Sequence, residues 1–210
     1  MATLLQVHSS PLGEDASFSR QLTSEFVQQW RRTHPDGKVI TRDVAATNLA
    51  PLNAEWIGAA YTPEASLTAR QREVLALSHE LIAELKTADE YVFGVAMHNF
   101  SIPGALKLWI DQVVRAGHTF AYENGAPNGL LRNKKATFIV ASGGVYEQGT
   151  PPYVMNFVEP YLRSVFGFVG VTETIFISAS GTARARFGLD RQIILEPARQ
   201  SIQGQFQAAA

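Results

Sequence analysis

Residues 91–111 constrain the fold of this chain more than any other segment. Residues 91–96 form an almost continuous apolar run, which is typical of a strand that is buried on both faces. After Pro103, apolar residues recur at intervals of three and four, which predicts a helix with one buried face. A buried strand followed at once by an amphipathic helix is the repeating unit of a parallel α/β sheet.

The same alternation runs through the rest of the chain. We expect strands at residues 3–7, 38–43, 135–141 and 171–179, and helices that begin near Phe18, Leu67 and Pro151. A less regular helix is expected over 184–203 and a frayed tail over 205–210. The pattern predicts one α/β domain spanning 1–210, with a five-stranded parallel sheet and helices on both faces.

Two segments interrupt this pattern. The periodicity fades over 44–67, which we interpret as a surface excursion; its Trp56 and Tyr61 either cover a pocket or simply pack on the body of the protein. Residues 115–129 are rich in Gly, Asn and Pro, and Asn124-Gly125 indicates a short hairpin. In an extended segment, Phe120 and Tyr122 would point the same way.

Composition excludes several function classes. The 210 residues include no cysteine, so thiol nucleophiles, thiolate metal sites and disulfides are absent. A net charge of −1 gives no basic face for nucleic acid. No apolar run has the length of a membrane span and no leader is visible, so we expect a cytoplasmic protein. The five histidines are scattered without an H-E-x-x-H pattern, and no metal site is expected.

The turn Met97-His98-Asn99-Phe100-Ser101 lies at the carboxyl end of the strand over 91–96, where open α/β sheets bind ligands. The Asn99 amide both donates and accepts, which suits a ring with adjacent C=O and N–H groups. Two alternatives for Asn99 remain open: it stabilises the turn, or it caps the next helix. His98 is either a ligand contact or a solvated turn residue.

Two further turns follow predicted strands. The loop after the first strand carries Ser10, Ser17 and Ser19 and leads into a helix N-terminus, which suits an anion such as a terminal monophosphate. It has neither a dinucleotide fingerprint nor a P-loop, and its alternative is a surface loop with capping serines. Gly143 and Gly144 either admit a ligand to the backbone or form a tight turn. Parallel topology brings all three turns to one edge.

Taken together, these motifs resemble the FMN-dependent NADH-azoreductase family, also described as NAD(P)H:quinone oxidoreductases of flavodoxin-like fold. The resemblance covers nearly the whole chain. It rests on H-S-S with S-F-S eight residues on, M-H-N-F, L-K-L-W-I-D, R-A-G-H-T-F-A-Y-E-N-G, S-G-G and P-Y-L-R-S-V-F-G-F-V-G. It implies a sheet with strand order 2-1-3-4-5. Departures from the family pattern at Phe18, Ala96, His98 and Ser142 bear on substrate range and nicotinamide preference.

The resemblance also implies a cofactor and the residues that bind it. FMN would lie at the strand ends, with NADH or NADPH as donor and an azo compound or quinone as acceptor, in a two-electron ping-pong cycle. The residues implied in cofactor binding are Ser10, Ser17, Phe18, Ser19, Met97, His98, Asn99, Phe100, Ser142, Gly143 and Gly144. Phe120, Tyr122 and Phe168 match positions that shape the pocket over the flavin. The family works as a homodimer whose flavin site is completed by the partner subunit.

Two other classes stay open. A flavodoxin-like electron carrier would bind FMN without turning over a small substrate, but such carriers are usually strongly acidic, unlike this chain. A regulatory domain without its flavin would give a colourless protein. No catalytic side chain is expected in the enzyme, because the flavin carries the chemistry.

Overall fold

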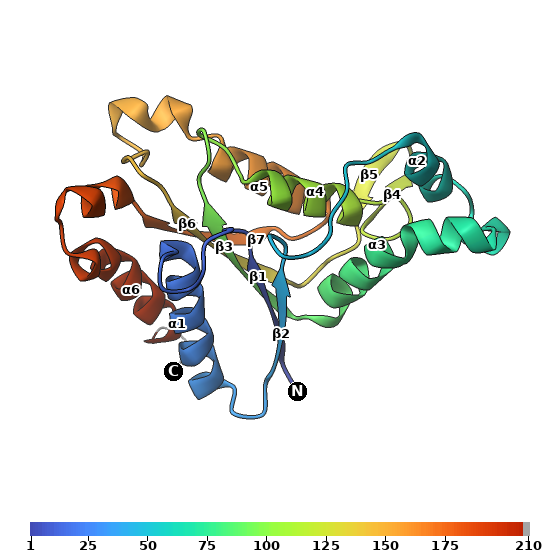
Figure 1. Cartoon of the computed structure of the whole chain (residues 1–210). Coiled ribbons are helices and arrows are strands. Elements are labelled where there is room, and N and C mark those ends of the chain that lie inside the picture. Colours follow the sequence, from blue (N-terminus) through green and yellow to red (C-terminus); the bar gives the residue numbers. More distant parts are fainter. Residues whose placement is uncertain (208–210) are drawn as a thin grey trace.

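A parallel sheet of five strands forms the centre of the computed structural model, which describes residues 1–207 (Figure 1). The strands are β1 (Thr3–His8), β2 (Lys38–Asp43), β3 (Glu90–Ala96), β6 (Lys135–Ala141) and β7 (Glu173–Ala179), in the order β2-β1-β3-β6-β7. The predicted order 2-1-3-4-5 numbered only the five strands of the sheet. The described residues form seven, because β4 (Phe120–Glu123) and β5 (Ala126–Gly129) make a separate hairpin.

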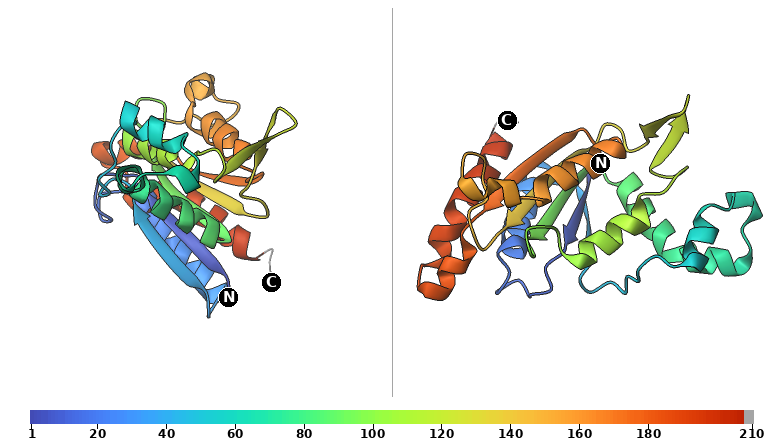
Figure 2. Two further views of the ribbon diagram at one scale, coloured as in Figure 1. Left: turned by 90° about the vertical axis from the view of Figure 1, so that its right-hand side faces the viewer. Right: turned by 90° about the horizontal axis from the view of Figure 1, so that it is seen from above.

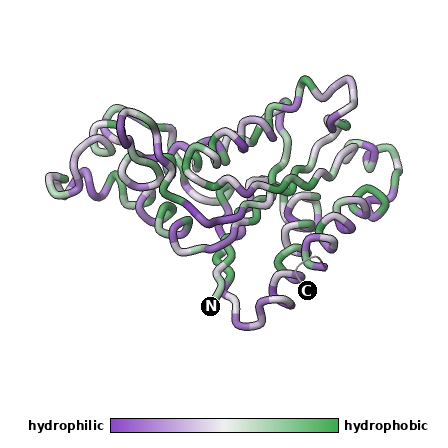
Figure 3. Tube along the Cα trace, turned by 180° about the vertical axis from the view of Figure 1, so that it is seen from behind, coloured by the Kyte–Doolittle hydropathy of each residue, from purple (hydrophilic) through white to green (hydrophobic). Residues whose placement is uncertain are grey.

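Helices cover both faces of the sheet, as the sequence predicts (Figures 1 and 2). One face carries α1 (Phe18–Thr33) and α6 (Arg191–Gln207), and the other carries α3 (Ala69–Thr87), α4 (Gly104–Val113) and α5 (Val158–Phe168). Successive strand residues point to opposite faces, so both layers are apolar where they meet the sheet. The middle of the sheet is correspondingly hydrophobic (Figure 3).

The two cores differ in their packing. Trp30 of α1 and Leu195 of α6 pack against Val92 and its neighbours on the first face. On the second face, the Phe93 ring stacks on that of Phe138 with centroids 5.1 Å apart. This aromatic layer fixes α4 and α5 against β3 and β6, and therefore fixes the turn that leads into α4.

Side chains cap the starts of two helices. The Ser17 hydroxyl accepts a hydrogen bond from the Arg20 backbone at the start of α1, which confirms the expected capping serine. Thr68 and Gln71 form a reciprocal capping box at the start of α3, which satisfies two backbone N–H groups that a helix end leaves free.

Some boundaries differ from the prediction. The 44–67 segment contains helix α2 (Ala54–Ala60) and the 3-10 helix η1 (Glu64–Ser66), which are too short for periodicity to reveal. The helix expected from Pro151 is divided into η2 (Pro151–Met155) and α5, with Pro160 in the first turn of α5. The segment before α6 contains η3 (Thr182–Phe187). The predicted fraying over 205–210 is wrong for 205–207, which are helical because Phe206 packs on Phe26; residues 208–210 lie outside the described part.

The β4–β5 hairpin confirms the prediction made from Asn124-Gly125. Both residues have positive φ, 53° and 79°, as a two-residue hairpin turn requires. The hairpin rests on the end of α5, where the Leu131 backbone N–H donates to the carbonyl of Val169 at 2.9 Å. There the backbones of Gly129 and Gly170 touch, and a Cβ added to Gly129 would lie 2.2 Å from the Gly170 nitrogen.

Among residues 1–207, no helix combines the length and apolarity that a bilayer crossing requires.

Candidate functional site

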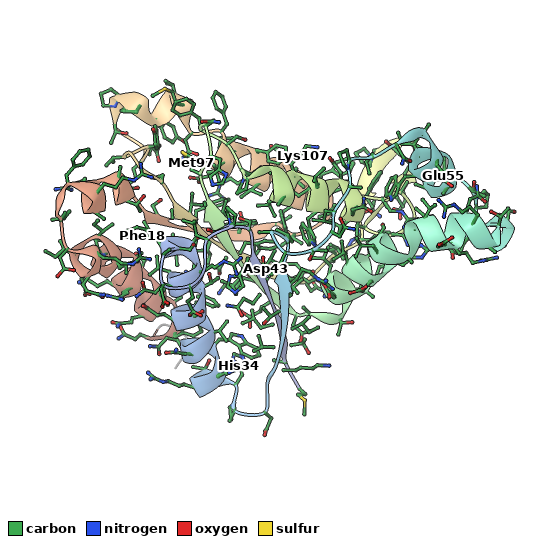
Figure 4. All side chains as sticks on the ribbon, viewed as in Figure 1. Phe18, His34, Asp43, Glu55, Met97 and Lys107 are labelled. Carbon is green, nitrogen blue, oxygen red and sulfur yellow. The ribbon has the colours of Figure 1, made fainter. Side chains whose placement is uncertain are left out.

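The three predicted turns meet at one cleft of about 530 Å³ on the carboxyl edge of the sheet. The strands in front of them are adjacent and in register, with His8 beside Gly94 and Ala96 beside Ala141. Figure 4 shows Phe18 and Met97, one from each of two turns, on the same side of the molecule. The lining residues are Ser10, Leu12, Ala16, Ser17, Phe18, Ser19, Ala96, Met97, His98, Ala141, Gly143, Thr182, Ala183 and Arg186.

The first wall of the cleft is the N-terminus of α1. The hydroxyls of Ser17 and Ser19 lie 3.3 Å apart, and both side chains are buried. Among residues 1–207, the backbone N–H groups of Phe18 and Ser19 have no acceptor. Free N–H groups at the positive end of a helix, beside two hydroxyls, form an arrangement that binds an anion. Ser17 also caps the helix, so the capping alternative is confirmed, and the anion site stays a prediction.

Arg20 holds the loop that carries Ser10 in place. Its guanidinium donates to the carbonyl of Ser10 at 2.6 Å and forms an ion pair with Asp43 at 2.7 Å. These bonds hold Ser10 in place and leave little of the Arg20 charge for a ligand. Burial lowers the pKa of His8 at the end of β1, and the charge of Arg20 lowers it further. His8 is therefore neutral near pH 7.

The second wall is the turn after β3, of which Met97 and His98 line the cleft whereas Asn99 and Phe100 do not. The backbones of His98 and Ser101 bond to each other in both directions, at 2.9 and 3.1 Å. Between them, Asn99 and Phe100 have φ of 48° and 72°. A left-handed Phe is strained, and such strain persists only where the surroundings impose it. Here the Phe157 N–H donates to the Phe100 carbonyl at 3.0 Å, and the Tyr146 ring packs edge-on against the Phe100 ring.

This turn decides between the alternatives for Asn99. The residue before α4 is Pro103, and no side chain caps that helix, so the capping alternative is wrong. The left-handed φ gives a local reason for asparagine at this position. The exposed Asn99 amide has no hydrogen-bond partner within residues 1–207, so it remains free to bind a ligand. The His98 side chain is exposed.

The third wall is the turn Ser142-Gly143-Gly144 after β6, of which Gly143 alone is among the residues that line the cleft. The carbonyls of these residues accept hydrogen bonds from Thr182, Ala183 and Gly181, in that order, at 3.0 to 3.3 Å. The N–H groups of Gly143 and Gly144 have no acceptor in the described part of the chain. Neither glycine has positive φ, so a left-handed turn does not explain them. Added to Gly143, a Cβ would meet only Ala183, at 3.6 Å.

Segment η3 contributes residues that the sequence analysis missed. Thr182 and Ala183 line the cleft, and their backbone N–H groups bond to the Gly-Gly turn. The exposed Arg186 is the one arginine or lysine among the described residues that line the cleft. The only sequence signal was the pair of arginines in R-A-R-F, which lacks any recognised spacing.

Comparison with known proteins gives consistent relatives. A family model described as flavodoxin-like fold matches residues 2–204. An FMN-dependent NADH:quinone oxidoreductase of Acidobacterium capsulatum is 54% identical over 96% of this chain and 98% of its own length. A Burkholderia lata protein named FMN-dependent NADH:quinone oxidoreductase 3 is 45% identical over 94% of this chain and 95% of its own.

This chain belongs to the family of FMN-dependent NADH:quinone oxidoreductases, within the flavodoxin-like fold.

Solved structures agree with this family assignment. An azoreductase from Bacillus anthracis is 25% identical, with a TM-score of 0.87 over 99% of this chain and all of the other. An FMN-dependent NADH-azoreductase from the same species, in complex with FMN, shares the fold at 23% identity and a TM-score of 0.87.

The three residues that the resemblance places in the substrate pocket lie outside the strand-end cleft of their own chain. Phe120 and Phe168, with ring centroids 4.7 Å apart, line a second, mainly apolar cavity of about 620 Å³. Tyr122 packs against Phe120 with its side chain 68% exposed. The two cavities have no lining residue in common, so one chain does not bring these aromatic residues to the strand-end cleft.

The 44–67 excursion forms the opposite wall of this second cavity. Trp56, Ile57 and Tyr61 line it, and the Trp56 indole N–H donates to the Gln112 side chain at 2.9 Å. Trp56 therefore both packs on the protein and covers a pocket. Glu55, at the start of α2, lies far from Phe18 and Met97 in Figure 4. The strand-end cleft, not this cavity, holds the donors that a phosphate needs.

Proposed function

We propose that this protein binds FMN in the strand-end cleft and uses NADH to reduce quinones and azo compounds. The observation that carries the proposal is the convergence of three turns, each with free backbone N–H groups, on one cleft of about 530 Å³. That volume falls in the usual range for cofactor sites, roughly 300–1,000 Å³. The relatives named above, together with the family, support the same activity.

The phosphate end of FMN fits the first wall. Ser10, Ser17 and Ser19 supply hydroxyls, and the N–H groups of Phe18 and Ser19 supply backbone donors. A phosphate gains most from such donors where a helix dipole adds its positive end. Arg186, which is exposed and lines the cleft, adds a positive charge that suits a dianion.

The flavin ring fits between the other two walls. Met97, His98, Asn99 and Phe100 would border one edge, and Ser142, Gly143 and Gly144 the other. Bound there, FMN supplies the two-electron chemistry by which a nicotinamide reduces a quinone or an azo bond. The free N–H groups of Gly143 and Gly144 favour negative charge on any polar edge that faces them. The protein therefore orients and stabilises, and no side chain acts as nucleophile.

The proposal includes a homodimer. Phe120, Tyr122 and Phe168 do not reach the cleft of their own chain, yet Tyr122 and Phe168 leave apolar surface exposed. In a dimer, this surface of one subunit would close the flavin site of the other. Light scattering on the purified protein tests the assembly, and a monomer at micromolar concentration contradicts it. A cytoplasmic location remains a prediction from the sequence.

Spectroscopy separates this function from its alternatives. We expect a yellow protein whose flavin absorbance bleaches when NADH is added without oxygen, and which consumes NADH with menadione and with methyl red. Bleaching without turnover of either acceptor would indicate an electron carrier. A colourless protein that takes up no added FMN would contradict the proposal.

Removing the Asn99 amide should weaken FMN binding. We expect Asn99→Gly to lower the affinity by about tenfold, since one or two hydrogen bonds contribute roughly 1–2 kcal/mol. Glycine keeps the positive φ without strain, whereas Asn99→Ala also destabilises the turn by roughly 1 kcal/mol. Fluorescence titration of flavin-free protein measures the affinity. Equal affinity in wild type and Asn99→Gly would remove this side chain from the site.

A further inference from the structure

A cluster of one carboxylate and two imidazoles lies outside both cavities described above. Glu64 of η1, His79 of α3 and His118, which precedes β4, come from three separate segments. One ligand atom from each of the three lies within 4.8 Å of the others. The same residues line a shallow cavity of about 280 Å³ at the protein surface. Their wide separation in the sequence explains why spacing alone gave no sign of a metal site.

One ring nitrogen of this cluster lacks a hydrogen-bond partner. The His79 Nε2 atom is buried and has no hydrogen-bond partner among the described residues. The closest carboxylate oxygen, on Glu64, is 3.8 Å away, which is too far for a hydrogen bond. A buried ring nitrogen normally has a partner, because leaving it unpaired destabilises the fold. A metal ion between the two groups would supply that partner.

We propose that Glu64, His79 and His118 bind one divalent transition-metal ion, for which Zn²⁺ is the best match. Two imidazoles and one carboxylate form a ligand set that zinc commonly takes, with water in the fourth position. In a tetrahedral zinc site, ligand atoms lie about 3.4 Å apart. The ligand atoms of the cluster lie within 4.8 Å of one another and the Glu64 side chain is 61% exposed, so we expect side-chain rotation to close the remaining distance.

Arg115 and Lys86 set a limit on the affinity. Their positive charges oppose a cation, although the Arg115 side chain donates to Ser78 at 3.0 Å and lies over the Trp56 ring. Arg115 thus has two partners of its own, although its Nε atom is buried without one among the described residues. We expect micromolar rather than nanomolar affinity for zinc.

Such a site would join the two walls of the second cavity. Glu64 lies in the same 44–67 excursion as Trp56, Ile57 and Tyr61, and His118 precedes Phe120 on the opposite wall. A shared ion would hold these segments at a fixed separation. It would stabilise the folded state in proportion to its concentration, because it binds only where the three segments meet.

Calorimetry on tag-free, flavin-loaded protein with ZnCl₂ tests the proposal. We expect one zinc ion per chain, and affinity weaker by at least about tenfold in His79→Gln, His118→Gln and Glu64→Gln. Zinc should also raise the melting temperature of wild type but not of these variants. His34→Gln, which changes a histidine far from the cluster, is the matched control and should bind zinc as wild type does.

Two results would overturn the inference. One is the absence of a one-to-one binding event in the wild type. The other is equal zinc affinity in wild type and Glu64→Gln, whose exposed position makes misfolding no explanation. Flavin absorbance and circular dichroism, recorded on every variant, verify that each histidine variant is folded before its affinity is compared.

Discussion

Replacing Ser17 with aspartate should weaken FMN binding by at least about 100-fold while leaving the fold intact. Aspartate caps a helix as well as serine does, so the bond to the Arg20 backbone is retained. Its charge, however, would lie where the proposed phosphate meets the α1 N-terminus. Two unit charges about 4 Å apart repel by about 4 kcal/mol at an effective dielectric constant of about 20. Allowing for partial screening by solvent, we expect at least about 100-fold weaker FMN binding.

Asparagine at the same position is the matched control. Asn is an equally good cap but carries no charge, so Ser17→Asn should keep most of the FMN affinity. Riboflavin, which lacks the phosphate, gives a second comparison: its affinity should be similar in the Asp and Asn variants. The measurement is flavin titration of the flavin-free proteins, with melting temperatures recorded alongside. If the Asp variant retains FMN as the Asn variant does, the phosphate does not lie at this helix.

Gly129→Ala should be the most destabilising single methyl addition in the hairpin region. The new Cβ would lie 2.2 Å from the Gly170 nitrogen and 2.3 Å from the Val169 carbonyl carbon, and both are backbone atoms that cannot rotate away. Overpacking of this kind costs about 3 kcal/mol or more. For a chain of this size we expect a fall in melting temperature of roughly 6–12 °C.

Gly167→Ala offers a control within the same region. Gly167 lies in α5, and a Cβ there would meet no atom within 4 Å. Alanine is the better helix former, so stability should be unchanged or higher by up to about 1 kcal/mol. Thermal unfolding with equal cofactor loading compares the two variants. Similar melting temperatures for both would show that the hairpin does not rest on the end of α5.

The sequence predicted the sheet and the position of the cleft because both depend on local patterns. Buried strands such as residues 135–141 have apolar runs with sharp ends, and parallel topology then requires that their following turns meet. Capping pairs such as Thr68 and Gln71 likewise act within one helical turn. These features need no knowledge of distant contacts.

Other features depend on contacts between distant segments, and sequence patterns do not record them. Helix α2 has seven residues and is held by packing against α3 rather than by its own periodicity. Arg186 reaches the cleft only because Gly181–Ala183 bind the Gly-Gly turn. The position of Phe120 and Phe168, away from the cleft of their own chain, depends on how α4 and α5 cross the sheet.

The strained turn after β3 has a consequence for protein engineering. Phe100 keeps its left-handed backbone because Phe157 and Tyr146 brace it from a segment that contributes nothing to the lining of the cleft. Substitutions in that brace should alter the shape of the proposed cofactor site from a distance. Variants at Tyr146 and Phe157 therefore offer a way to tune the reduction potential of the flavin or the choice of electron acceptor. The residues that line the cleft would stay unchanged.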